Sequence, residues 1–302
     1  MANSIEVIIN SNSGARRARE MKVILERILA RSGRTYGVTI SGRDSLSRVI
    51  DEKAATDCEI LVAAGGDGTA SALAKVALER GKVLGVLPLG TFNYFARSLD
   101  IPLDLEAAAR VILEGRAREV PVLDLDGRLV LNNTSIGILS AALLRRRELY
   151  RRWGRSQLNT YLSVLLTLFQ APPRLRVRLV TAQGELERRT PMVMICSSAF
   201  QMENFALAGK ECLQANQFAV YVARLAGRLT LFRLGLRTLL RRLRAGIDYE
   251  VICVSDVTIE RLKRRRFRAT IDGELEPIES PMRVRMNPRR LSVMAARGEA
   301  IG

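Results

Sequence analysis

The stretch LVAAGGDGTASALAKVAL, residues 61–78, decides the fold. An apolar run typical of a buried strand ends in glycine, and a long helical pattern begins at Thr69. Residues 65–69, Gly-Gly-Asp-Gly-Thr, therefore form a corner between a strand and a helix. The N–H groups and the dipole at a helix start favour an anion, and glycines leave the backbone accessible to it. Glycine is also the ordinary residue of any sharp turn, so phosphate binding and a simple turn both stay open.

The N-terminal half of the chain repeats this strand-then-helix pattern. Strands are expected at residues 5–10, 35–41, 58–66 and 82–90, and each is followed by a helical pattern. In the first helix, which is expected to begin near residue 13, apolar residues at Met21, Ile24, Leu25, Ile28 and Leu29 share one face. Strands that alternate with helices predict a Rossmann-like α/β domain with a parallel sheet covered on both faces.

The pattern changes after about residue 120. A hairpin is expected around Asp126-Gly127, and most later segments alternate in the manner of strands. Helical patterns are found around 138–170 and 229–244. We therefore predict an α/β nucleotide-binding domain over residues 1–125, to which a tail of about 288–302 returns. The β-rich domain, a mainly antiparallel β-sandwich over residues 126–287, is expected to form a ligand cleft with it.

A second glycine corner follows the next predicted strand. The segment LPLGTFNYFAR, residues 87–97, contains Gly90 for a turn and then Thr91 and Asn93 at a helix start. Thr91 is also well placed to be a simple N-cap. Because parallel strands end at the same edge of a sheet, the two corners are expected to form one continuous edge, which is where α/β sheets bind ligands.

Four motifs in this order resemble the diacylglycerol kinase catalytic-domain family, which includes bacterial lipid kinases and sphingosine kinases. GGDGT is shared with NAD kinases, whereas G-T-x-N-x-F-A is characteristic of the lipid kinases. The resemblance extends over nearly the whole chain. The motifs are INSNSG (9–14), GGDGT (65–69), PLGTFNYFA (88–96) and TIDGEL (270–275).

The resemblance implies transfer of the γ-phosphoryl group of ATP to a lipid hydroxyl, with Mg²⁺ as cofactor. Diacylglycerol or a sphingoid or ceramide-type alcohol would be the acceptor. The family pattern assigns nucleotide contacts to a set of residues in the N-terminal half, namely Asn10, Ser13, Ser41, Gly65, Gly66, Asp67, Gly68, Thr69, Gly90, Thr91 and Asn93.

The fourth motif contains the acidic turn Asp272-Gly273-Glu274. Taken alone it predicts a hairpin turn. The resemblance implies that Glu274 is the general base for the lipid hydroxyl and that Asp272 organises the metal–nucleotide region. Asp67 is the second candidate, as base or as Mg²⁺ partner. The chain has no histidine, so a carboxylate is the available base.

Apart from a minor change at Ser11, where the family commonly has proline, the chain departs from the family pattern at three positions. Leu139 stands where the family has an acid, and Ala215 and Ala219 replace carboxylates of a structural Mg²⁺ site in many bacterial members. Magnesium prefers hard oxygen ligands, so this second site is expected to be absent. The alternative function is therefore a nucleotide- or lipid-binding regulatory protein with lost or altered kinase activity.

The net charge of +17 indicates an anionic partner. Segment 143–157 combines arginines with leucines, a tyrosine and the only tryptophan, and segments 236–244 and 262–268 add positive charge. These segments favour peripheral contact with an anionic membrane, although 143–157 reads equally well as a solvated helix face. Since no recognised nucleic-acid module is found, nucleic-acid binding is not expected.

The spacing of the cysteines indicates whether the protein belongs to an oxidising or a reducing cellular compartment. Cys58, Cys196, Cys212 and Cys253 lie far apart in the sequence with no CxxC pair, which excludes an ordinary zinc site and indicates a reducing compartment. The N-terminus lacks the order of a signal peptide. We expect a cytoplasmic protein at the inner face of the membrane, with a homodimer left open.

Overall fold

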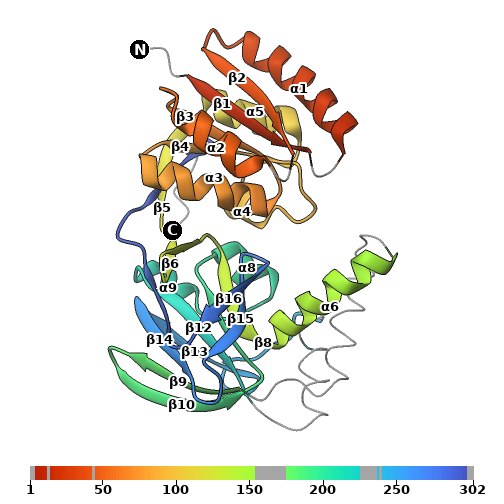
Figure 1. Ribbon diagram of the computed structural model, residues 1–302. Coiled ribbons are helices and arrows are strands. Elements are labelled where there is room, and N and C mark those ends of the chain that lie inside the picture. The colour runs from red at the N-terminus through yellow and green to blue at the C-terminus, as the bar shows by residue number, and fades with distance from the viewer. Residues whose placement is uncertain are drawn as a thin grey trace. The chain divides into compact units, whose positions relative to one another are not determined.

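The computed structural model describes residues 4–11, 14–42, 45–153, 175–224, 237 and 240–297, without the side chains of 146–148 and 150–153. The chain divides into two compact units (Figure 1). Unit 1 is Met1–Val122 together with Asn287–Gly302, and unit 2 is Leu123–Met286.

Unit 1 is built on one six-stranded sheet with the order β2-β1-β3-β4-β18-β5. All pairings in it are parallel except that of β5 with β18. Every residue of β3 is buried, as expected for a central parallel strand covered on both faces. The strands are β1 (Ile5–Asn10), β2 (Tyr36–Ser41), β3 (Ile60–Gly65), β4 (Val83–Pro88), β5 (Arg116–Val120) and β18 (Leu291–Ala295).

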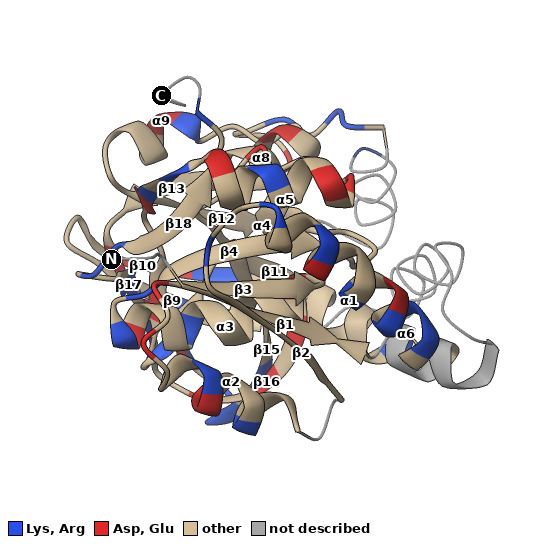
Figure 2. Ribbon diagram, turned by 90° about the horizontal axis from the view of Figure 1, so that it is seen from above, with Lys and Arg blue, Asp and Glu red and all other residues tan. Residues whose placement is uncertain are grey.

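The helices of unit 1 follow the strands in turn. They are α1 (Ala15–Ala30), α2 (Leu46–Ala54), α3 (Asp67–Arg80), α4 (Tyr94–Ser98) and α5 (Leu105–Glu114). On α1 the buried residues Ala18, Leu25 and Leu29 lie on one face, which is the amphipathic spacing read from the sequence. Figure 2 shows Lys or Arg next to Asp or Glu on the outer faces of α1 and α2, where Arg16 pairs with Glu20.

Unit 2 contains two six-stranded sheets in which all pairings are antiparallel. Sheet B has the order β10-β9-β14-β17-β6-β7 and sheet C the order β13-β12-β11-β8-β15-β16. Residues of both sheets share one apolar core that includes Leu125, Val177, Val220 and Ile259. The predicted fold class is therefore confirmed, with a parallel α/β sheet followed by antiparallel sheets.

The strands of unit 2 are short, and most follow one another through tight turns. They are β6 (Leu123–Leu125), β7 (Arg128–Val130), β8 (Asn133–Gly137), β9 (Leu175–Thr181), β10 (Gly184–Thr190), β11 (Met192–Cys196), β12 (Phe218–Ala223), β13 (Tyr249–Val254), β14 (Asp256–Arg261), β15 (Arg266–Ile271), β16 (Glu274–Glu279) and β17 (Met282–Met286).

The helices of unit 2 differ from the prediction. Helix α6 (Ile138–Trp153) lies within the first predicted helical stretch, while most of 229–244 falls outside the described residues. Two helices were not predicted, α8 (Ala199–Asn204) and α9 (Lys210–Gln214). Each is too short to show a helical period in the sequence. The N-cap of α8, Ser198, whose side chain accepts a hydrogen bond from the Gln201 N–H, was the available signal.

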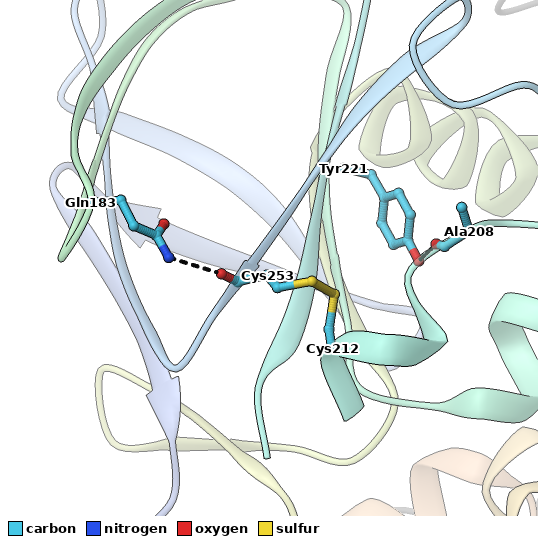
Figure 3. The surroundings of a disulfide bond; sticks show 5 residues. All are labelled: Gln183, Ala208, Cys212, Tyr221 and Cys253. Carbon is cyan, nitrogen blue, oxygen red and sulfur yellow. Dashed lines mark hydrogen bonds between the residues drawn. A yellow bond between two sulfur atoms is a disulfide. The ribbon is translucent and has the colours of Figure 1, made fainter. Parts of the chain in front are cut away.

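A disulfide joins Cys212 of α9 to Cys253 of β13 (Figure 3). The two cysteines are 41 residues apart in the sequence, but α9 packs beside β12, and β12 pairs with β13. The premise of four separated thiols, on which the expected reducing compartment rested, is therefore wrong for this pair. Cys58 and Cys196 are free and buried.

Nearby side chains fix the surroundings of the disulfide. The Tyr221 hydroxyl donates a hydrogen bond to the Ala208 carbonyl at 2.7 Å, and the Gln183 amide donates to the Cys253 carbonyl at 3.4 Å. Among the described helices, none is long and apolar enough to cross a lipid bilayer.

Candidate active site

The two glycine corners of unit 1 are in direct contact. A Cβ atom on Gly90 would lie 2.5 Å from the Cα atom of Gly66, and a Cβ atom on Gly66 would lie 3.3 Å from the Cα atom of Gly90. A Cβ atom on Gly65 would collide with the Thr69 side chain. Glycine is therefore required at this point by close packing of backbone against backbone, and the expected continuous edge consists of two touching loops.

Polar side chains hold these two corners in place. The Asn10 amide at the end of β1 donates a hydrogen bond to the Thr69 hydroxyl at 2.8 Å, and Thr69 is buried. Asn93 adopts a left-handed backbone conformation with φ of 52°. Its side chain accepts a hydrogen bond from the Gly90 N–H and donates one to the Gly90 carbonyl, both at 3.0 Å. The Asn93 side chain therefore holds the backbone of the second corner, while the bond between Asn10 and Thr69 ties the end of β1 to the start of α3.

Asp67 links the first corner to the helix that follows the second. Its Oδ1 atom accepts a hydrogen bond from the Phe95 N–H at 3.0 Å, in the first turn of α4. Burial raises the pKa of the Asp67 carboxyl group, and the N–H groups of Phe95, Tyr94 and Asn93 lower it by smaller amounts. The carboxylate is half-buried, so part of it stays accessible.

The accessible surface of the corners is mainly backbone. Gly68, Gly90 and Thr91 are exposed, and Gly66 is half-buried. The N–H groups of Thr69 and Ala70 donate to the Gly66 carbonyl at 2.9 and 3.0 Å, so the N–H groups of α3 that precede these bonds are those of Asp67 and Gly68. The arrangement thus offers N–H donors and a positive dipole end to an anion.

Two further predicted nucleotide contacts are Ser41, the last residue of β2, and Ser13. Ser41 is buried, and its hydroxyl lies 3.1 Å from the Ser45 hydroxyl and donates to the Gly42 carbonyl at 3.0 Å. Ser13 lies outside the described residues. The structure thus places the Ser41 side chain within its own loop.

The acidic turn of the fourth motif, Asp272-Gly273-Glu274, forms a hairpin turn between β15 and β16 in unit 2. Asp272 and Gly273 have φ of 46° and 85°, the left-handed pair that an Asp-Gly hairpin needs. The Asp272 carboxylate accepts hydrogen bonds from the N–H groups of Leu131, Asn132 and Asn133 at 2.8, 2.7 and 3.2 Å. Asp272 therefore holds the loop that leads into β8, a role the sequence did not indicate.

Glu274 is the first residue of β16 and is exposed, paired in register with Ile271. The Cys196 thiol of β11, in the same sheet, is fully buried, and burial raises its pKa to about 12. A thiol with such a pKa stays protonated at neutral pH, so Cys196 is no candidate for a catalytic base or nucleophile.

The structure also places the three positions that depart from the family pattern. Leu139 lies in the first turn of α6, Ala215 ends α9, and Ala219 is buried in β12. Sequence reasoning missed the backbone donors of residues 131–133 and of Phe95 entirely. No signal in the sequence identifies them, because any residue supplies an N–H group.

Comparison with known proteins shows which family the N-terminal part of the chain resembles. Residues 4–125 match the family model described as the diacylglycerol kinase catalytic domain. The similarity to this family is therefore shown over residues 4–125, and the resemblance seen in the motifs of that part of the chain is confirmed.

Individual relatives agree with this assignment. A curated protein of Pseudomonas aeruginosa named "Probable lipid kinase YegS-like" is 40% identical over 121 residues, 39% of each chain. One of the same name from Klebsiella pneumoniae is 46% identical over 77 residues, 25% of each chain. The chain thus aligns with less than two-fifths of either relative. The crystal structure of a diacylglycerol kinase from Bacillus anthracis shares the fold, with a TM-score of 0.70, 13% identity and 98% coverage of both chains.

Proposed function

We propose that this protein is an ATP-dependent lipid kinase that transfers the γ-phosphoryl group to a lipid hydroxyl at the membrane surface. Diacylglycerol or a sphingoid or ceramide-type alcohol is the proposed acceptor. The observation that carries the proposal is the contact between Gly66 and Gly90, which leaves accessible backbone N–H groups at the start of α3. The match of residues 4–125 and the names of the relatives support the same reaction class.

In this proposal the corners bind the triphosphate mainly through backbone. The N–H groups around Gly66 and Gly68 and the exposed corner at Gly90 and Thr91 donate to phosphate oxygens. Asn93 contributes indirectly, because its side chain holds the Gly90 backbone, and the bond between Asn10 and Thr69 ties the first corner to the end of β1.

Asp67 is the proposed residue for Mg²⁺. A carboxylate offers about four lone-pair positions, so Asp67 can keep its hydrogen bond to the Phe95 N–H and still present oxygen to a cation. Oxygen is the ligand that Mg²⁺ prefers, so the side chain fits the ion. When bound, Mg²⁺ would neutralise charge on the phosphate oxygens during transfer.

Glu274 is the proposed general base. The lipid hydroxyl oxygen forms a bond to the γ-phosphorus as the bond from that phosphorus to the β–γ bridging oxygen breaks, and ADP leaves. The hydroxyl proton passes to the Glu274 carboxylate. Asp272 acts as a positioning residue, because its carboxylate is already engaged by three backbone N–H groups beside the turn that carries Glu274.

The test is transfer of labelled phosphate from ATP to a total lipid extract. Glu274→Gln should lower the rate by about 10²–10⁴-fold, the usual contribution of a general base, with ATP affinity retained. Glu276→Gln, on the same strand, is the matched control and should keep its activity.

A second function, regulatory binding of nucleotide or lipid without catalysis, is favoured by the departures at Leu139, Ala215 and Ala219. The same assay separates the two. Wild type that binds ATP but phosphorylates no lipid in the extract would support regulation and refute the kinase.

A further inference from the structure

One end of unit 2 concentrates arginine on the outer face of sheet B. Arg176 of β9 and Arg189 of β10 lie directly opposite each other across the strand pair, so their side chains share a face. Both are exposed. Two residues further along these strands, Arg178 and Glu187 occupy the next opposing positions on the same face.

The turn between β14 and β15 adds charge at the same end. The Leu262 N–H donates a hydrogen bond to the Arg176 carbonyl at 3.1 Å, which places the start of this turn beside β9. Lys263, Arg264 and Arg265 follow, and all three are exposed. We call these three residues together with Arg176 and Arg189 the basic end of unit 2.

Other arginines on the outer face of sheet B are paired with carboxylates, unlike those of the basic end as far as the structure describes the chain. Arg178 pairs with Glu187 at 2.9 Å and with Glu260 at 3.2 Å, and Arg283 pairs with Asp256. In the part of the chain that the structure describes, none of the five residues of the basic end forms a salt bridge.

This concentration of charge is unfavourable within the protein itself. Like charges directly opposite on neighbouring strands destabilise a sheet, as Arg176 and Arg189 do here. Burial first and the charge of Arg264 second lower the pKa of the Arg261 guanidinium, which lies next to this turn. An anionic partner would relieve this repulsion.

Exposed apolar side chains at the same end favour a lipid surface over nucleic acid as the anionic partner. The Ile138 N–H, at the start of α6, donates to the carbonyl of Pro191, two residues after Arg189. From there α6 runs away from sheet C, as Figure 1 shows. It carries Leu139 and Leu144 with 37% and 42% of their surface exposed.

Exposed leucines beside clustered cations suit a lipid surface, which offers both anionic headgroups and acyl chains. Binding of single-stranded nucleic acid would instead need exposed aromatic rings to stack on the bases. The one described aromatic ring at this end, that of Phe267, is buried under Arg261.

We propose that the basic end of unit 2, with the adjoining leucines of α6, is the surface that docks this protein on an anionic phospholipid membrane. The inference deepens the proposed function, since it names where a lipid kinase would meet the bilayer that holds its substrate. It uses residues apart from the corners and from Glu274.

The test is co-sedimentation with vesicles of phosphatidylcholine containing phosphatidylglycerol, compared with vesicles of phosphatidylcholine alone. The variant Lys263→Gln/Arg264→Gln/Arg265→Gln removes three charges from a turn. Because each basic residue near an anionic surface contributes about 1 kcal/mol, its partition should fall about 100-fold. Leu139→Ser/Leu144→Ser should also weaken binding, because α6 would lose its apolar contact.

A control with the same change in net charge shows whether position matters. Arg16→Gln/Arg48→Gln/Arg80→Gln removes three exposed cations from the helices of unit 1 and should change vesicle binding by less than threefold. Equal loss in both triple variants would overturn the proposal, since net charge alone would then explain binding.

Two further outcomes keep this inference separate from the kinase proposal. Vesicle binding requires no ATP, so a protein without kinase activity still tests the docking surface. If the Lys263/Arg264/Arg265 variant lost binding to duplex DNA but kept vesicle binding, the basic end would be a nucleic-acid surface and the membrane assignment would be wrong.

Discussion

Replacing Gly90 with alanine tests the arrangement of the two corners directly. The new Cβ atom would lie 2.5 Å from the Gly66 Cα atom and 2.7 Å from the Asn93 Oδ1 atom. Carbon atoms pack at about 3.5–4.0 Å, so the two loops would have to separate by about 1 Å. The obstructing atom is backbone, so rotation of a side chain cannot relieve the collision.

The expected cost follows from this geometry. Overpacking of a tightly packed site costs about 1–3 kcal/mol. The φ angle of Gly90 is not in the left-handed region, so alanine adds no conformational strain of its own. If the displacement falls on the backbone donors that bind the triphosphate, the affinity for ATP should drop by about 5- to 150-fold.

The assay is ATP binding by isothermal titration calorimetry together with thermal unfolding. Gly81→Ala is the matched control, because Gly81 ends α3 with φ of 65° and has nothing near its Cβ position. That variant should lose about 1–2 kcal/mol of stability through left-handed strain and keep its affinity for ATP. If Gly90→Ala bound ATP as wild type does, the corners would not form the phosphate site.

Three other predictions concern the carboxylates of Asp67 and Asp272 and the disulfide in unit 2. Because burial raises the pKa of Asp67, the folded protein binds its proton more readily than the unfolded chain, so ionisation of Asp67 removes stability as pH rises from 3.8 through the raised pKa. Asp67→Asn should therefore flatten the pH dependence of stability between pH 3.8 and the raised pKa of Asp67, as measured by urea unfolding; unchanged dependence over this range would contradict it. Asp272→Ala leaves three N–H groups without their acceptor and should cost about 2–5 kcal/mol, whereas Asp256→Ala on the exposed face should cost less than about 1 kcal/mol. Reducing the bond between Cys212 and Cys253 should cost about 4 kcal/mol from the closed loop alone, and calorimetry with and without a dithiol would show no change if that bond does not form.

Much of unit 1 could be predicted from the sequence because its signals are local. The apolar runs at Ile60–Gly65 and Val83–Pro88 identify strands, and the spacing of Leu25 and Leu29 identifies the buried face of α1. Such patterns depend on periods of two and about 3.6 residues along the chain, which any window of the sequence contains. The hairpin at Asp272-Gly273 is of the same kind, since the turn needs left-handed residues.

The role of each candidate side chain was harder to predict. The two glycine motifs predicted that Asp67, Thr69 and Asn93 belong to one site. Their hydrogen bonds depend on how the loops pack: Asp67 bonds the Phe95 N–H, Thr69 bonds Asn10, and Asn93 bonds Gly90. From the sequence, all three side chains were predicted to contact the nucleotide. The structure separates the side chains that fasten the loops from the backbone that remains accessible.

The sequence by itself determined the alternation of strands and helices, the glycine corners, the acidic turn and the excess of positive charge. Tertiary structure alone decided that Gly66 touches Gly90, that Asp272 holds a loop 140 residues earlier in the chain, and that Arg176 faces Arg189 without a carboxylate. The physical reason is the range of the interactions. Backbone preferences and hydrophobic periods act between near neighbours, whereas these contacts depend on strand register and loop packing between distant segments, which no short pattern of residues encodes.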